Sequence, residues 1–139
     1  MRLDPDEARR RFATGRVAYL ATLRADGTAA QVPIVFEGSG DRVVSVVDPK
    51  PKRTPELVRL QHIAHEPRVA LLVDHYEDDW QRLWWARAEG LARAVPEGSE
   101  RDDALARLLA KYPQYRTLDG PFGAAVIVEV ARWTGWSAT

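Results

Sequence analysis

The fold class follows from a hairpin pattern in the first third of the chain, where residues 17–23 read VAYLATL, residues 25–28 read ADGT and residues 31–36 read QVPIVF. Both apolar runs have the length and composition of strands, and Asp26-Gly27 is a preferred turn between antiparallel strands. Pro33 lies inside the second run, although proline cannot donate a backbone hydrogen bond to a neighbouring strand. We therefore expect Pro33 at a sheet edge, at a bulge, or beside a neighbour other than a strand, such as a ligand.

The remaining sequence adds strands in hairpin-like succession, with three helices between them. Asp4 and Glu7 have the spacing of a capping box, and Ser99 is expected to begin the last helix. The strand at 68–74 is almost continuously apolar, which predicts burial on both faces. We expect helices at 5–13, 55–65 and 100–111, strands at 17–23, 31–36, 42–47, 68–74, 82–95 (despite Gly90) and 124–130, and a turn at 37–41. The prediction is a mainly β single domain, 1–139, built as a six-stranded antiparallel barrel with peripheral helices.

The composition excludes several classes of protein. Twenty basic and twenty acidic residues give a formal net charge of zero, which argues against general nucleic-acid binding and removes one barrier to self-association. The absence of cysteine excludes disulfides and thiolate metal sites. Because no apolar run approaches the length of a membrane span and the first residues are polar, we expect a cytoplasmic protein.

A basic segment follows the third strand, where residues 45–55 read SVVDPKPKRTP. Thr54 has the chemistry of a helix N-cap, and Pro55 suits the first helical position. Backbone N–H groups, the helix dipole and the cations all favour an anion at such a junction, and phosphate is the expected ligand. The alternative is a solvated basic turn.

The order of these motifs resembles the pyridoxamine 5'-phosphate oxidase-like superfamily, the FMN-binding split barrels. The resemblance rests on the first hairpin, the basic segment with its short helix, and the strand that ends in RAEG at 87–90. More narrowly, DHYEDDW at 74–80, LWW at 83–85 and RWTGW at 132–136 resemble the actinobacterial branch of deazaflavin (coenzyme F-420)-dependent reductases. The resemblance covers nearly the whole chain.

The resemblance implies a homodimer with two cofactor sites in the subunit interface, and it implies coenzyme F-420 or, in related members, FMN. Carried over position by position, the resemblance places along the cofactor the strand residues Gln31, Val32, Pro33, Ile34, Ser45, Val46 and Val47. The phosphate-binding pair is Lys52 and Arg53, with Lys50 and Thr54 close by. Trp85 and Arg87 match the residues that reach the cofactor of the other subunit. The C-terminal segment that binds pyridoxal phosphate in the oxidases has no match here, so oxidation of pyridoxamine phosphate is not expected.

The tryptophans and histidines leave alternatives open. On a regular strand Trp85, Arg87 and Glu89 share one face, while Trp84, Ala86 and Ala88 share the other. One tryptophan is then expected in the core, and the next is expected to face an interface or the cofactor ring. The three histidines, His62, His65 and His75, complete no known metal pattern, and we expect no metal. His75 as a proton donor is an alternative to a purely structural role.

The activity that the resemblance implies is hydride transfer. In such reactions the cofactor supplies the chemistry, so the protein needs no nucleophile–base pair. No catalytic side chain is assigned. The leading hypothesis is an oxidoreductase that uses reduced coenzyme F-420 on a conjugated, electron-poor small molecule, such as a quinone, an enone or a tetrapyrrole. The alternatives are an FMN-dependent oxidoreductase and a non-catalytic split-barrel module that binds a cofactor.

Overall fold

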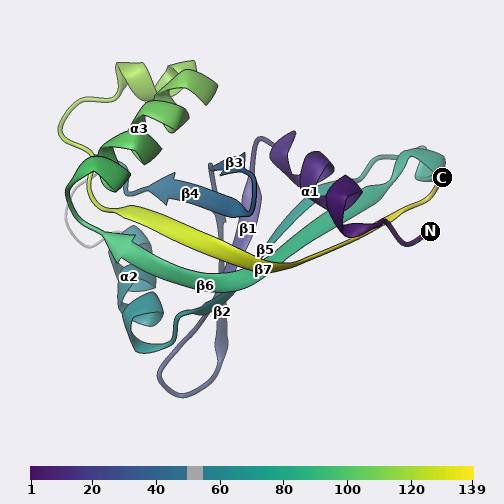
Figure 1. Ribbon diagram of the computed structural model, residues 1–139, viewed down its shortest axis with the longest axis horizontal. Coiled ribbons are helices and arrows are strands. Elements are labelled where there is room, and N and C mark those ends of the chain that lie inside the picture. The colour runs from purple at the N-terminus through teal and green to yellow at the C-terminus, as the bar shows by residue number, and fades with distance from the viewer. Residues whose placement is uncertain (50–54) are drawn as a thin grey trace.

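The computed structural model describes residues 1–49 and 55–139, apart from the side chains of residues 55–57. Within this part of the chain, seven strands form one antiparallel sheet in the order β2-β1-β5-β6-β7-β4-β3 (Figure 1). The strands are β1 (Ala18–Leu23), β2 (Ala29–Ile34), β3 (Glu37–Ser39), β4 (Arg42–Val46), β5 (Arg68–His75), β6 (Trp84–Val95) and β7 (Ala125–Ser137). The helices are α1 (Pro5–Ala13), α2 (Pro55–His65) and α3 (Ser99–Lys111), with 3-10 turns η1 (Trp80–Arg82) and η2 (Pro113–Thr117).

The sheet is rolled but unclosed, because β2 and β3 occupy its two opposite edges and yet are joined by only Val35 and Phe36. Three Cα–Cα steps reach at most about 11 Å, so the two edges must approach each other at this link. The barrel is therefore split, as expected, and Pro33 lies on the edge strand β2, which confirms one of the three positions predicted for it.

The strand count and several local predictions were wrong. Glu37–Ser39, expected as part of a turn, forms β3 by pairing with Arg42–Val44, and residues 132–136 continue β7 instead of forming a tail. β5 alternates buried residues with half-buried ones over 69–73, since only one of its faces lies against the core. Gly98 takes the N-cap position of α3, without a side-chain cap hydrogen bond from Ser99. At α1 the Asp4 carboxylate accepts from the Glu7 N–H, as predicted, but the Glu7 carboxylate binds Arg10 and Arg11 instead of returning to the cap.

Two hydrophobic clusters stabilise the rolled sheet. The first lies inside the roll under α1, where Phe12 packs against Phe36 and Trp133 with ring centroids 5.0 and 5.3 Å apart. The second lies between β4, β7 and α3, where Ala104 and Leu108 of the predicted apolar helix face are buried. β6 and β7 curve around the first cluster through a bulge at Gly90, where an added Cβ would lie 2.1 Å from the Glu129 carbonyl oxygen.

The link between the two sheet edges is held by the C-terminal end of α3. The buried Tyr112 hydroxyl lies 2.9 Å from the Phe36 carbonyl oxygen, 2.9 Å from the Arg16 carbonyl oxygen and 3.2 Å from the Phe36 nitrogen, whose N–H donates to it. The Lys111 ammonium lies 4.0 Å from the centre of the Phe36 ring. Burial, and then the nearby Arg16 charge, lowers the pKa of this ammonium to about 8. One helix end therefore fixes the residue that brings the sheet edges together.

We expect Tyr112→Phe to lower the free energy of unfolding by about 1–3 kcal/mol, because the change leaves buried backbone groups at the link without their partner. Urea denaturation followed by tryptophan fluorescence measures the difference. The control is Ser99→Ala, which also removes one hydroxyl, since Ser99 is exposed and makes no side-chain cap hydrogen bond at α3. Equal stability of the two variants would contradict this role for Tyr112.

Candidate functional site

A cavity of about 210 Å³ opens at the seam of the split barrel. β3 stops after its pairing with Val44, so that Ser45 and Val46 lie at an open edge facing the end of β2. The cavity wall takes Pro33 and Ile34 from β2 and Val46 from β4. The other wall residues are Val17, Val35, Asp48, Arg59 and Tyr115. The seam therefore combines an apolar strand wall with three polar side chains.

The polar wall comes from three separate elements. The Tyr115 hydroxyl, from η2, donates a 2.6 Å hydrogen bond to Oδ1 of Asp48, which follows β4. Arg59 lies on α2, and only 6% of its surface is exposed. Burial, and then the hydrogen bond to Asp48, raises the pKa of the Tyr115 hydroxyl, while the Arg59 charge acts in the opposite direction. The cavity thus has a neutral hydroxyl, a carboxylate and a buried guanidinium at one end.

Arg59 is the site residue that sequence reasoning missed. It precedes the buried Ile63 by four residues, so the two share the inward face of α2, while Val58 is 49% exposed. The sequence signal that could have identified Arg59 is its position on the apolar face of the helix. A cation buried there needs an anionic or hydrogen-bonding partner, which indicates a site. Asp48 and Tyr115 were also missed, because their contact joins residues 67 positions apart.

The residues predicted to line the cofactor fall into three groups. Pro33, Ile34 and Val46 come together at the cavity. Of the other strand residues, Ser45 and Val47 are buried, Val32 is half-buried and Gln31 is exposed, and none of these four is part of the cavity wall. The basic residues Lys50, Lys52 and Arg53, together with Thr54, lie outside the described residues.

Trp85 and Arg87 lie on the outer face of the sheet and do not line the cavity, although Pro33, which does, lies in the same cross-strand row as Arg87. The cross-strand register places Pro33, Tyr19, Leu72 and Arg87 in one row, and directly opposed residues point to the same face. The Arg87 guanidinium carbon lies 5.0 Å from the centre of the Trp85 ring. Trp84 packs against the first core cluster, which confirms that the two tryptophans face opposite sides.

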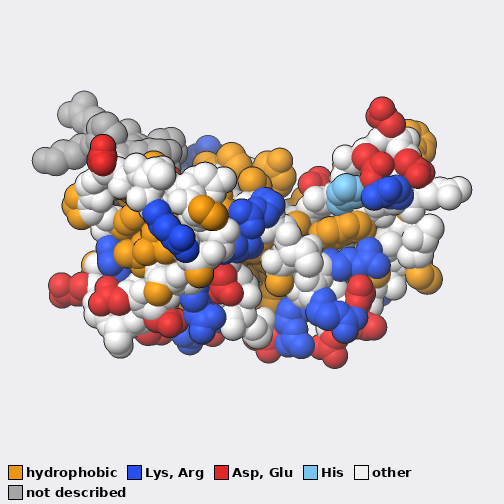
Figure 2. Space-filling model, turned by 90° about the horizontal axis from the view of Figure 1, so that it is seen from above, with side chains coloured by type: hydrophobic (Ala, Val, Ile, Leu, Met, Phe, Trp, Pro, Cys, Tyr) orange, Lys and Arg blue, Asp and Glu red, His pale blue; other side chains and the backbone are white. Residues whose placement is uncertain are grey.

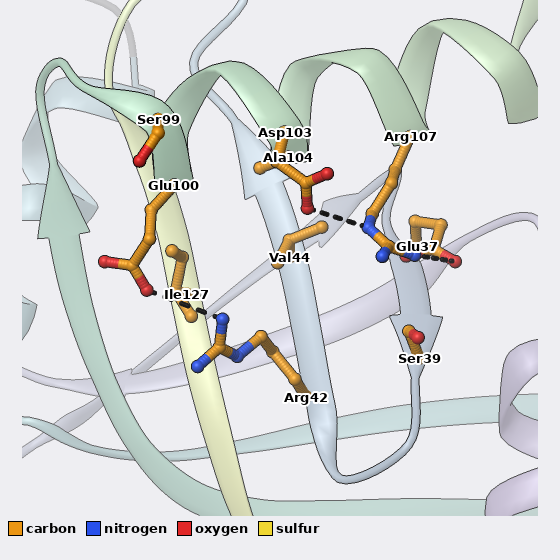
Figure 3. Close-up of a pocket in the computed structure, with 10 residues that line it drawn as sticks. All are labelled: Glu37, Ser39, Arg42, Val44, Ser99, Glu100, Asp103, Ala104, Arg107 and Ile127. Atoms are coloured by element: carbon orange, nitrogen blue, oxygen red, sulfur yellow. Dashed lines mark hydrogen bonds and ion pairs between the residues drawn. The ribbon is translucent and has the colours of Figure 1, made fainter.

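A second, larger cavity of about 500 Å³ separates α3 from β3 and β4 (Figure 3). Its charged residues pair with one another: Arg107 with Asp103 at 2.9 Å and with Glu37 at 3.8 Å, and Arg42 with Glu100 at 3.4 Å. It contains none of the predicted site residues. The pair of Arg107 with Asp103 lies within α3, whereas the pairs of Arg107 with Glu37 and of Arg42 with Glu100 join α3 to β3 and β4.

The histidines have separate surroundings in the structure. His75 Nε2 lies 2.6 Å from Oε1 of Glu77, and His62 Nδ1 lies 3.0 Å from the Thr22 hydroxyl. Among the described residues, no three metal-ligating side chains lie together. No described helix is both long enough and apolar enough to span a bilayer.

Comparison with known proteins agrees with the split-barrel topology. The family model described as pyridoxamine 5'-phosphate oxidase matches residues 4–137, almost the whole chain. The chain belongs to the pyridoxamine 5'-phosphate oxidase family. A search of curated proteins gives no significant match.

Solved structures at low sequence identity share this fold. A FAD-binding protein from Mesorhizobium loti is 19% identical with a TM-score of 0.72, over 97% of this chain and 93% of that one. A conserved hypothetical protein from Mycobacterium tuberculosis is 16% identical with a TM-score of 0.75, over 98% and 86% of the two chains. A heme-binding protein from Mycobacterium smegmatis is 22% identical with a TM-score of 0.71, over 96% of this chain and 57% of that one.

The Tyr115 hydroxyl is expected to stay protonated in the folded protein well above pH 10. Wild type and Tyr115→Phe should therefore show the same rise in tyrosinate absorbance at 295 nm up to pH 11, as long as both stay folded. Because the folded state then holds a proton that the unfolded state releases, this group lowers stability as the pH rises above 10. A smaller absorbance rise in the variant would show that Tyr115 ionises in the folded state.

Proposed function

We propose that this protein is a homodimeric oxidoreductase that uses reduced coenzyme F-420 to deliver a hydride to a conjugated, electron-poor small molecule such as a quinone, an enone or a tetrapyrrole. The observation that carries the proposal is the seam cavity, in which an apolar strand wall ends at the buried guanidinium of Arg59. α2, which holds Arg59, begins at Pro55, two residues after Arg53, the last cation of the basic segment.

The side chains at the seam fit a ribityl phosphate. A guanidinium binds phosphate through two parallel hydrogen bonds, and its burial strengthens that attraction. The Asp48 carboxylate, oriented by Tyr115 at 2.6 Å, is an acceptor for hydroxyl groups of a polyol chain. In this proposal Arg59 and the basic segment hold the phosphate, Asp48 orients the chain, and Pro33 with Ile34 exclude water from the apolar side.

The chemistry comes from the cofactor, which in its reduced form supplies the hydride when it is bound. The protein then needs to position the cofactor and leave one face open to a flat acceptor. Catalytic residues are not assigned, since no nucleophile–base pair is required for this reaction class.

Two observations support a homodimer with cofactor sites between the subunits. The seam cavity, at about 210 Å³, is smaller than the 300–1,000 Å³ typical of sites that enclose a drug-sized ligand, so the rest of a flavin-sized cofactor needs a second surface. The outer face of the sheet exposes Tyr19 and Leu91, at 45% and 55%, around the row that holds Arg87. In the proposed dimer Trp85 and Arg87 reach the partner's cofactor from this face.

FMN is the second candidate cofactor, because it has the same ribityl phosphate and one of the structures that share the fold is that of a FAD-binding protein. A non-catalytic module that holds a cofactor without turnover is the third candidate. The proposal therefore needs a binding experiment before an activity screen.

The test is titration of the pure protein with coenzyme F-420 and, separately, with FMN, followed by cofactor and tryptophan fluorescence. We expect saturable binding of coenzyme F-420 and weaker binding of FMN. Arg53→Ala and Arg59→Met should each weaken binding about tenfold or more, since each removes one charge-assisted contact worth about 1.5–3 kcal/mol. The control is Arg10→Ala, whose side chain is 71% exposed on α1.

The outcomes separate the candidates. Tighter binding of FMN would move the protein to the flavin-dependent class. Binding of neither cofactor, or an Arg59→Met variant that folds normally and binds as wild type does, would overturn the seam as the cofactor site. Tight binding without turnover on a panel of quinones, enones and tetrapyrroles would favour the non-catalytic module.

A further inference from the structure

The turn between β5 and β6 is an exposed aromatic and acidic tip, and its exposure requires an explanation. Residues 76–80 read YEDDW, with 61% of the Tyr76 surface and 76% of the Trp80 surface exposed. Figure 2 shows acidic side chains at the right-hand end of the molecule, where Figure 1 places this turn. Two large aromatic residues exposed on one turn are costly in water and typical of interface anchors.

The tip is held in one conformation before any partner binds. Oδ1 of Asp79 accepts from the Gln81 N–H at 3.1 Å and caps η1. Glu77 Oε1 lies 2.6 Å from His75 Nε2 and 3.0 Å from Arg82 Nε, so Glu77 ties the end of β5 to the end of η1. A pre-ordered anchor loses little conformational entropy on association.

A groove with complementary chemistry lies on the outer face of the same sheet. It has a volume of about 520 Å³ and follows the cross-strand row Ala21–Ala70–Glu89–Arg132. Its wall is almost entirely apolar and includes Leu91, which is 55% exposed.

Charge distinguishes the rim of this groove from the tip. The rim contains two arginines, Arg68 and Arg132, and one carboxylate, Glu89. Arg132 lies 4.0 Å from a carboxylate oxygen of Glu89, and 62% of its side chain is exposed. The tip contains three carboxylates and no cation between residues 76 and 80. Arg68 is paired with Glu66 at 2.8 Å and Glu77 with Arg82 at 3.0 Å within one copy. The charges that complement each other are therefore Asp78 of the tip and Arg132 of the rim. The aromatic side chains of the tip match the apolar wall.

We propose that the 76–80 tip of one copy of this chain docks in the Ala21–Ala70–Leu91 groove of a second copy, with Asp78 against Arg132. This inference rests on the homodimer of the proposed function and assigns its contacts. Arg68 and Asp74 lie about 20 Å apart along β5, at 3.3–3.4 Å per residue. A two-fold axis that lies parallel to the outer face and runs perpendicular to β5, between these two residues, turns the two outer faces toward each other and exchanges the ends of β5. Each tip then lies over the other copy's groove, so the contact occurs twice and closes.

The first test measures the dimer dissociation constant by sedimentation velocity. Trp80→Ser should weaken the dimer at least tenfold, because a buried aromatic anchor is lost at both ends of the interface. Leu118→Ser is the control, since Leu118 is an exposed apolar residue after η2 that belongs to neither surface. Asp78→Arg and Arg132→Asp should each weaken the dimer, and the double variant should restore it.

The second test uses the absence of cysteine from the chain. Gln81→Cys combined with Ala131→Cys should form a disulfide-linked dimer on mild oxidation, whereas Gln81→Cys combined with Ala106→Cys, on the exposed side of α3, should not. Cross-linking of Gln81→Cys alone would show tip-to-tip contact and overturn the proposal.

The remaining outcomes separate this inference from the proposed function. A dimer that Trp80→Ser leaves intact overturns the docking surface and retains the homodimer. A wild-type protein that stays monomeric overturns both. A dimer dissociated by Trp80→Ser in a protein that binds neither cofactor supports the docking and overturns only the cofactor assignment.

Discussion

The rest of the structure depends on the two-residue link between β2 and β3. Val35 and Phe36 connect strands at opposite edges of a seven-stranded sheet, and a link this short forces the sheet to roll until its edges meet. Phe36 is fully buried under α1, and its backbone is bonded to Tyr112 at the end of α3. α1 and α3 are therefore the supports that keep an open sheet in the shape of a barrel.

The same constraint creates the candidate site. Because β3 is only three residues long, it leaves the end of β4 without a strand partner on the edge away from β7, and the roll brings that open edge to face Pro33 and Ile34. Proline is tolerated at the edge because it has no N–H to leave unsatisfied there. The polar residues then arrive from elements that the roll brings together: Asp48 after β4, Arg59 from α2 and Tyr115 from η2. A closed barrel of the same strands would have paired this edge and left no seam.

Local chemistry made most of the elements predictable, and long-range geometry explains why the polar end of the cavity was missed. The Asp26-Gly27 turn and the Asp4 cap depend on neighbouring residues, so the first hairpin and α1 were predicted within a residue or two. Glu37–Ser39 has no strand composition, and it pairs with β4 locally, through the two-residue turn Gly40-Asp41 with Gly40 at a φ of 58°. Pro33, Ile34 and Val46 were predicted from the family resemblance. The polar end of the cavity was missed, because the contact between Asp48 and Tyr115 depends on the three-dimensional roll.

The uncovered outer face follows from where the supports lie. α1 packs on β6 and β7 at the inner face, and α3 packs on β3 and β4, so both helices serve the link and the seam. No described helix is left to cover the outer row from Pro33 to Arg87. In this sheet the helices pack on the inner face and on one edge. The outer face must then be polar or be covered by a second chain. This face keeps Tyr19, Leu72 and Leu91 beside Arg87. The seam and the apolar outer face are therefore two consequences of one rolled sheet, which is why a cofactor at the seam and a partner on the outer face belong to the same proposal.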